Sequence, residues 1–163
     1  MFENKYLNFV YSLVLVLITA GLNSYFNSVG MEAFYGELQL SALTPPNYVF
    51  PIVWAILYVL LILSFDMVLN HPDKKQVWIA AQLFITNMLL QVLWCFMFFF
   101  EAYFMVAFAV IVVLIFATLY LIQRFYYLRP VAAMMLIPYL LWLIFAAYLN
   151  WVVVDLNGTN YVF

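Results

Sequence analysis

Indole, phenol and amide side chains recur at helical spacing within three apolar segments of this sequence. In the segment around residue 90, Asn87, Gln91 and Trp94 are spaced i, i+4, i+7, which places them on one face of a helix. Trp54 and Tyr58, and likewise Trp142 and Ala146, are spaced i, i+4 in two other apolar segments. Indoles stack on flat apolar molecules, and amides in hydrocarbon must find hydrogen-bond partners. These faces could therefore bind a mostly apolar ligand with a few polar groups, although helix packing uses the same residues and is favoured by periodicity alone.

Acid–base, metal and redox chemistry have little support in the sequence. His71 is the single histidine and lies in a turn, so a haem with two axial histidines is excluded. Cys95 is the single cysteine, and we expect no metal site and no bound cofactor. Asp66 lies inside an apolar segment, which makes it a functional candidate, but it is close enough to the end of that segment to reach lipid headgroups or Lys74.

The composition places the chain in the lipid bilayer. Of its 163 residues, 71% are hydrophobic and 7% are charged, whereas soluble domains carry about 25% charged residues. A chain this short could not hide so much apolar surface in water. Five Lys and Arg residues and a net charge of −2 provide no basic surface for nucleic acid. We expect the first apolar stretch to be a retained helix rather than a cleaved signal peptide.

The apolar pattern predicts an all-α integral membrane protein, a five-transmembrane-helix bundle in a single domain over residues 1–163. Pro45-Pro46 and Pro130 are expected at helix starts, where a missing N–H costs little. A more polar connector is expected over residues 27–45. The predicted helices cover residues 6–26, 46–69, 76–100, 103–127 and 130–155.

The charges separate by side when the five helices are threaded through a bilayer. One face receives all five basic residues, and the other receives four acidic residues and no basic one. Because basic residues mark the cytoplasmic side, we expect a cytoplasmic N-terminus, with the 27–45 connector and the C-terminus outside. The basic residues are Lys5, Lys74, Lys75, Arg124 and Arg129, and the acidic residues are Glu32, Glu37, Glu101 and Asp155.

Three ordered blocks of this sequence resemble the translocator protein family, also called the tryptophan-rich sensory protein or TspO/MBR family. The first block is FYGEL at 34–38 followed by LTPPNYVFPIVWAILY at 43–58. The second is QVLWCFMFF at 91–99, and the third is LIPYLLWLIFAAYLN at 136–150. Each block lies on the helix expected for it, and together they cover most of the chain.

The resemblance implies a bundle that is commonly a homodimer and that binds porphyrins, notably protoporphyrin IX, as well as isoquinoline and benzodiazepine drugs. It also implies a pocket inside the bundle, with the 27–45 connector as its lid. Some bacterial members are reported to promote light-dependent porphyrin breakdown, and Trp54 and Trp142 match the positions tied to that activity. Carried over by motif, the ligand-binding residues are Tyr35, Pro45, Trp54, Tyr58, Asn87, Gln91, Trp94, Trp142 and Ala146.

The sequence departs from the family pattern in the lid and in the amide pair. Phe34 and Leu43 stand where the family usually has tryptophan, and Leu40-Ser41 stands where it usually has Lys-Pro. Asn87 and Gln91 exchange the usual order of the two amides.

The cholesterol motif of animal members is also altered, because Trp151 replaces its tyrosine and Asp155 its basic residue. We therefore expect no motif-based cholesterol binding.

Three functions remain open from sequence. The first is a membrane protein that binds porphyrin-like tetrapyrroles for sensing, scavenging or transfer. The second is an enzyme that degrades porphyrin under light, in which an indole quenches or reduces the photoexcited ring. The third is a small transporter or a structural subunit of a membrane assembly. The short N-terminus lacks an Arg-rich transit pattern, which favours a bacterial inner membrane.

Overall fold

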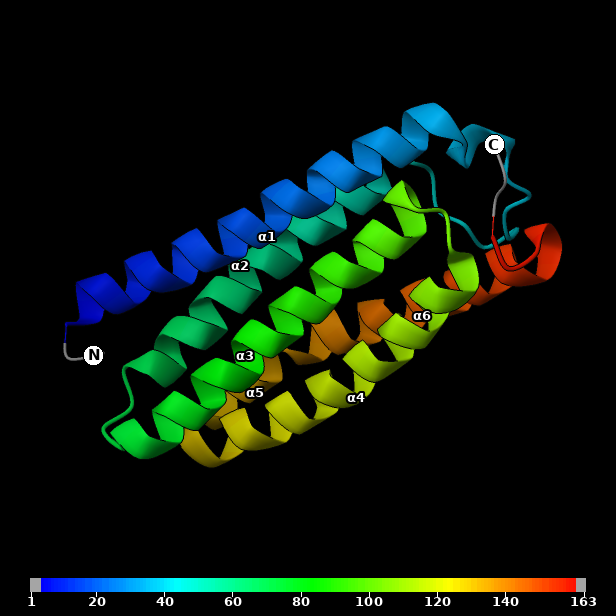
Figure 1. Cartoon of the computed structure of the whole chain (residues 1–163). Coiled ribbons are helices and arrows are strands. Elements are labelled where there is room, and N and C mark those ends of the chain that lie inside the picture. Colours follow the sequence, from blue (N-terminus) through cyan, green and yellow to red (C-terminus); the bar gives the residue numbers. More distant parts are fainter. Residues whose placement is uncertain (1–3, 161–163) are drawn as a thin grey trace.

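A computed structural model describes residues 4–160, and every regular element in that range is a helix. The long helices lie roughly alongside one another in an elongated bundle (Figure 1). Five segments, formed by α1, α2, α3 with η2, α4, and α5 with α6, are long and apolar enough to cross a membrane, and the chain is an all-α integral membrane protein. The elements are α1 (Lys5–Ala33), η1 (Tyr35–Glu37), α2 (Val49–Leu69), α3 (Lys74–Cys95), η2 (Phe96–Phe100), α4 (Phe104–Leu128), α5 (Pro130–Met135) and α6 (Ile137–Asn157).

The first helix is longer than the sequence pattern predicted. It was expected to end near Phe26, but α1 continues to Ala33, so residues 27–33 are helix rather than connector. No proline interrupts this stretch, and Gly30 lets α1 approach η2 closely. A Cβ at Gly30 would lie 2.5 Å from the Phe99 backbone oxygen.

The second helix begins later than predicted. Its start was expected at Pro46, but α2 begins at Val49, and the Val49 N–H donates to the Pro46 carbonyl in a preceding turn. Pro51 falls in the first turn of α2, where a missing N–H leaves no hydrogen bond unmade.

The predicted fifth helix is interrupted near its start. The segment expected over 130–155 is divided into α5 and α6 at Leu136. Pro138 explains the break, because it cannot donate a backbone hydrogen bond and its ring crowds the preceding turn. The chain recovers at once, and the Leu140 N–H donates to the Leu136 carbonyl.

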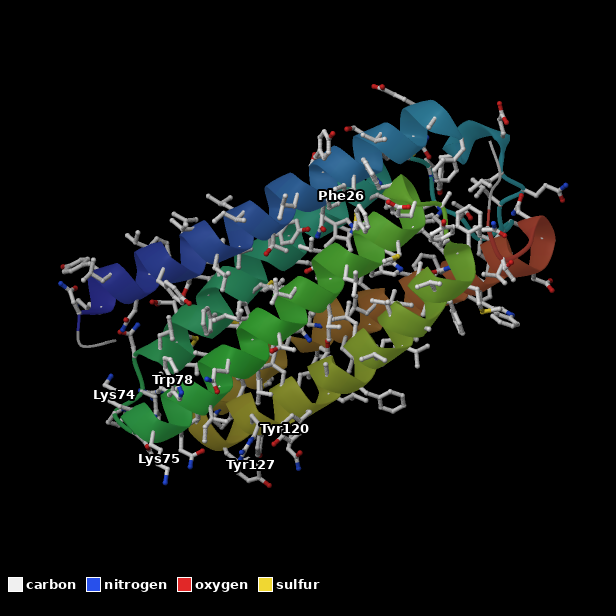
Figure 2. The ribbon with its side chains drawn as sticks, in the orientation of Figure 1. Phe26, Lys74, Lys75, Trp78, Tyr120 and Tyr127 are labelled. Atoms are coloured by element: carbon white, nitrogen blue, oxygen red, sulfur yellow. The ribbon has the colours of Figure 1, made fainter. Side chains whose placement is uncertain are left out.

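The two ends of the bundle differ in their connections. The start of α1, the α2–α3 turn and the α4–α5 junction lie at one end, and Lys74 and Lys75 mark it (Figure 2). The α1–α2 connector, the α3–α4 turn and the end of α6 lie at the other (Figure 1). We call the second the connector end. At this end η2 extends α3 by a π-helical turn, and Ala102 takes a positive φ of 54° as the chain reverses into α4.

Candidate functional site

A cavity of about 470 Å³ lies in the connector end of the bundle. Its size falls within the range of about 300–1,000 Å³ usual for small-molecule sites. Every long element except α4 contributes to its wall, together with the connector. The lining residues are Ala20, Asn23, Ser24, Asn27, Met31, Tyr35, Leu40, Thr44, Asn47, Phe50, Pro51, Trp54, Ala55, Tyr58, Trp94, Cys95, Phe98, Phe99, Trp142, Ala146, Leu149, Asn150 and Val153.

Three indoles from three different helices reach this cavity. Trp54 comes from α2, Trp94 from α3 and Trp142 from α6. Trp54 stacks on Tyr58 with ring centroids 5.5 Å apart and planes 28° from parallel. The Trp142 ring meets Phe50 edge to face at 5.9 Å. The walls are therefore aromatic surfaces suited to a flat ligand.

Hydrogen bonding fixes the orientation of Trp94. Its indole N–H donates to Asn150 Oδ1 at 3.2 Å, and Asn150 Nδ2 donates to the Phe104 carbonyl at 2.9 Å. The amide of Asn150 thus links α3, α6 and the start of α4. Because this bond holds the ring through its nitrogen, the Trp94 ring is positioned before any ligand enters.

Six of the nine predicted binding residues line the cavity, and three do not. The lining six are Tyr35, Trp54, Tyr58, Trp94, Trp142 and Ala146. Pro45 lies next to the lining residue Thr44 but does not itself line the cavity. Asn87 and Gln91, which we expected as polar anchors for a ligand, are fully buried outside the cavity wall.

The two predicted amides belong to a hydrogen-bond network beneath the cavity. Asn87 Nδ2 donates to Thr118 Oγ1 at 2.8 Å, and the Tyr139 hydroxyl donates to Asn87 Oδ1 at 3.0 Å. Gln91 Nε2 donates to the Tyr58 hydroxyl at 3.2 Å. Protein partners therefore occupy both amides, and Gln91 is linked to the cavity wall through its bond to Tyr58.

The first helix supplies polar lining residues that the sequence reasoning missed. Asn23, Ser24 and Asn27 follow one stripe of α1, with Ala20 one turn before them and Met31 one turn after. This i, i+3/i+4, i+7 pattern was available in the sequence. The prediction that the first helix ends at Phe26 concealed this pattern, because only its first half then lay on a helix.

The connector contributes Tyr35, Leu40 and Thr44 to the cavity wall and is attached to α6. Asn157 Oδ1 accepts from the Gln39 N–H at 2.8 Å, and Asn157 Nδ2 donates to the Gln39 carbonyl at 2.9 Å. The hydroxyls of Ser41 and Tyr148 lie 3.2 Å apart. Tyr35 packs against Phe99, and burial raises the pKa of its hydroxyl above the ordinary value of 10.0. We call the paired contact of Asn157 with Gln39 the connector latch.

The departures from the family pattern take different positions in this connector. Phe34 is buried against Phe104 and does not line the cavity. Leu40 lines the cavity, whereas Leu43 is exposed. Ser41 makes the contact with Tyr148 described above. An aliphatic side chain therefore stands in the cavity wall at position 40.

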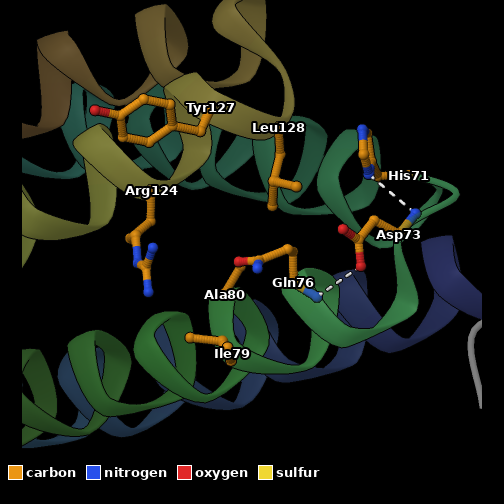
Figure 3. A pocket seen from close by; sticks show the side chains of 8 residues that line it. All are labelled: His71, Asp73, Gln76, Ile79, Ala80, Arg124, Tyr127 and Leu128. Atoms are coloured by element: carbon orange, nitrogen blue, oxygen red, sulfur yellow. Dashed lines mark hydrogen bonds between the residues drawn. The ribbon is translucent and has the colours of Figure 1, made fainter.

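A smaller pocket of about 150 Å³ lies near the opposite end, between the start of α3 and the end of α4 (Figure 3). Local structure accounts for its acidic and imidazole groups. Asp73 Oδ1 accepts from the Gln76 N–H and caps α3, while His71 Nδ1 accepts from the Asp73 N–H. This pocket contains none of the predicted binding residues. Asp66, the other carboxylate considered from sequence, accepts from Asn70 Nδ2 at 2.9 Å at the end of α2.

Comparison with known proteins identifies the family. The TspO/MBR family profile matches residues 11–155. A tryptophan-rich protein TspO from Bacillus cereus is 30% identical over 151 residues, covering 90% of this chain and 96% of the relative. The protein of that name from Archaeoglobus fulgidus is 29% identical over 155 residues, covering 93% and 98%. A third, from Chlorobaculum tepidum, is 32% identical over 126 residues, covering 76% and 79%. The resemblance carried by the three sequence blocks is confirmed, and the chain belongs to the TspO/MBR family.

Proposed function

We propose that this protein binds flat, mostly apolar aromatic ligands in the connector-end cavity, with porphyrin-like tetrapyrroles such as protoporphyrin IX as the leading class. The observation that carries the proposal is the convergence of Trp54, Trp94 and Trp142 on one hollow. Binding would serve sensing, scavenging or transfer of the ligand.

The shape and composition of the cavity support this ligand class. Aromatic rings stand on several sides, and small side chains at Ala20, Ala55 and Ala146 leave room between them. Stacking on an indole contributes roughly 0.5–1.5 kcal/mol beyond area burial, so several indoles around one disc add up to substantial affinity. The connector over the cavity would restrict exchange of the ligand with water.

A titration of purified protein with protoporphyrin IX tests the proposal. We expect saturable quenching of tryptophan emission, because a bound porphyrin lies close to the indoles. Ala146→Phe should weaken binding at least about tenfold, since the new ring enters the space the ligand needs. Trp78→Phe is the matched control, because Trp78 is exposed on α3 outside the cavity. Equal, unsaturable quenching of all three proteins would contradict the proposal.

A second candidate function is light-dependent degradation of the bound porphyrin. It is favoured by Trp54 and Trp142, which both line the cavity. In the first step, the excited porphyrin would accept one electron from an indole, giving a porphyrin radical anion and an indole radical cation. Dioxygen would then add to the radical anion, and return of one electron to the indole cation would leave a ring-opened product that carries both oxygen atoms. Trp54→Phe with Trp142→Phe should abolish product formation under light but retain dark binding. An unchanged illuminated rate would reject this activity.

We also propose that the protein spans a bacterial inner membrane, with the connector end on the outer side and the N-terminus in the cytoplasm. The support is the excess of Lys and Arg at the opposite end. Glu32→Cys should react with a membrane-impermeant maleimide in intact cells, whereas Lys75→Cys should react only after lysis, both in a Cys95→Ala background. The reverse pattern would invert the orientation.

A further inference from the structure

The cavity wall contains no charged side chain among the residues that the structure describes. Its side-chain polar groups include amides, hydroxyls, indole N–H groups and one thiol, all of them uncharged. The charged residues around it are acidic: Glu32, Glu37, Glu101 and Asp155 all belong to elements at the connector end, and the five basic residues belong to the opposite end. An anionic ligand group would therefore find no cationic partner in the wall and acidic neighbours outside it.

One amide oxygen in the cavity wall lacks a hydrogen-bond partner. Asn23 Nδ2 donates to the Tyr58 hydroxyl at 3.1 Å, but the buried Asn23 Oδ1 accepts from no group within residues 4–160. Such an orphaned buried acceptor costs free energy, so a ligand donor that meets it after a small rotation of the Asn23 side chain would be favoured.

The Tyr58 hydroxyl offers a complementary donor beside this acceptor. The Tyr58 hydroxyl oxygen receives N–H groups from both Asn23 and Gln91. Both lone pairs are then used, and the hydroxyl proton remains available for an acceptor. Asn23 and Tyr58 together offer one acceptor and one donor to an uncharged polar group.

We propose that the cavity selects uncharged ligands because the residues described in its wall supply no cation, and that Asn23 adds a preference among them for a neutral N–H or O–H group, from which its Oδ1 accepts a hydrogen bond. If the ligands are porphyrins, as the proposed function states, the cavity prefers their amide or ester derivatives to the dianionic free acid. A carboxylate entering this wall would lose its hydration without gaining an ion pair.

Three forms of one ring system provide the test. Protoporphyrin IX as its diacid, dimethyl ester and primary diamide should be titrated against the protein in lipid nanodiscs of zwitterionic phosphatidylcholine. We expect the diamide to bind most tightly and the diacid most weakly, with the ester at least about tenfold tighter than the diacid. Diacid affinity equal to or greater than that of the ester would overturn the proposal.

Substitutions on α1 separate the charge effect from the hydrogen bond. Asn23→Leu should erase the diamide's advantage over the ester, a loss of about fivefold. Asn27→Lys places a cation in the wall and should raise diacid affinity relative to the ester by about tenfold or more. Gln82→Leu and Gln82→Lys are matched controls, because Gln82 is exposed on α3 and does not line the cavity, and neither should change the ligand order. A diamide advantage retained in a folded Asn23→Leu protein would reject the role of Asn23.

A second probe pair keeps the inference testable if no porphyrin binds. N-Phenyl-1-naphthylamine is uncharged and carries an N–H, whereas 1-anilinonaphthalene-8-sulfonate is its anionic counterpart. Energy transfer from tryptophan should saturate with the neutral dye and be at least about tenfold weaker with the sulfonate, after subtraction of the Ala146→Phe background. Failure of all porphyrins with success of the neutral dye would reject porphyrins as the ligand class of the proposed function but retain this inference. Equal binding of both dyes would reject the inference itself.

Discussion

The two halves of this bundle use aromatic residues in opposite ways. In the half away from the connector, Phe65 and Phe84 stack with centroids 4.0 Å apart and planes 9° from parallel, and Phe125 continues the stack at 6.1 Å from Phe84. All three rings are fully buried. In the connector half, Trp54 and Trp142 remain partly exposed to a cavity. The same helices run through both halves, so side-chain size and placement decide which half is solid and which is hollow.

A polar layer separates the solid half from the hollow half. Along α3, successive turns present Phe84, then Asn87 and Gln91, then Trp94. Asn87 and Gln91 hold Tyr139 and Tyr58 by hydrogen bonds, and Tyr58 is part of the cavity wall. These directional bonds hold Tyr58 and Tyr139 in fixed positions at the floor of the cavity.

The largest expected effect is the loss of an aromatic ring from the solid half. Phe84→Ala should lower the free energy of unfolding by about 3 kcal/mol, because the neighbouring rings cannot close the void. Reversible denaturation of the purified protein in mixed micelles measures this change. The apparent ligand affinity should fall only in proportion to the loss of folded protein.

The matched change in the hollow half should cost much less. Trp142→Ala enlarges an existing space rather than opening a new one, so we expect less than half of the loss measured for Phe84→Ala. If the two substitutions destabilise the protein equally, the distinction between a packed half and a hollow half fails.

The sequence predicted the aromatic residues of the cavity wall better than the role of the polar layer beneath them or the polar residues that α1 contributes. The length of the apolar runs and the charge pattern were sufficient to predict five membrane-spanning helices. The i, i+4 spacing was sufficient to place Trp54 and Tyr58 on one helix face, and Trp142 and Ala146 on another. Spacing could not reveal that Asn87 and Gln91 contact other side chains, because a helical face does not specify what lies opposite it. Asn23 and Asn27 were missed because the end of α1 depends on a tertiary contact of Gly30 with η2. The break at Leu136 has a local signal in the sequence, because Pro138 lacks the backbone N–H that a continuous helix requires.

A smaller effect is expected from the polar layer. Asn87→Leu leaves the Thr118 hydroxyl and the Tyr139 hydroxyl without their shared partner, and it should cost about 1 kcal/mol of unfolding free energy. A double-mutant cycle with Tyr139→Phe, read by the same denaturation assay, should give a favourable coupling energy. Strict additivity of the two substitutions would show that the layer separates the halves without stabilising them.

The connector latch should affect the hollow half alone. Asn157→Ala removes both side-chain bonds to the backbone of Gln39, so the connector should open more often. Hydrogen exchange at the Gln39 amide should accelerate about tenfold, while amides of α3 around Phe84 keep their protection. Uniform acceleration at both places would indicate global destabilisation rather than opening of the connector.

The smallest expected effect is a pH dependence confined to the connector. Burial raises the pKa of Tyr35, so the folded protein retains this proton at pH values where the unfolded chain releases it. The stabilising contribution is therefore complete below the ordinary tyrosine pKa of about 10 and is lost as the pH rises further. Tyr35→Phe should reduce the fall in unfolding free energy above pH 10 and leave stability at neutral pH almost unchanged. Because lysines also titrate in this range, the difference between the two proteins is the relevant measurement, and parallel pH curves would show that Tyr35 ionises as freely in the folded connector as in the unfolded chain.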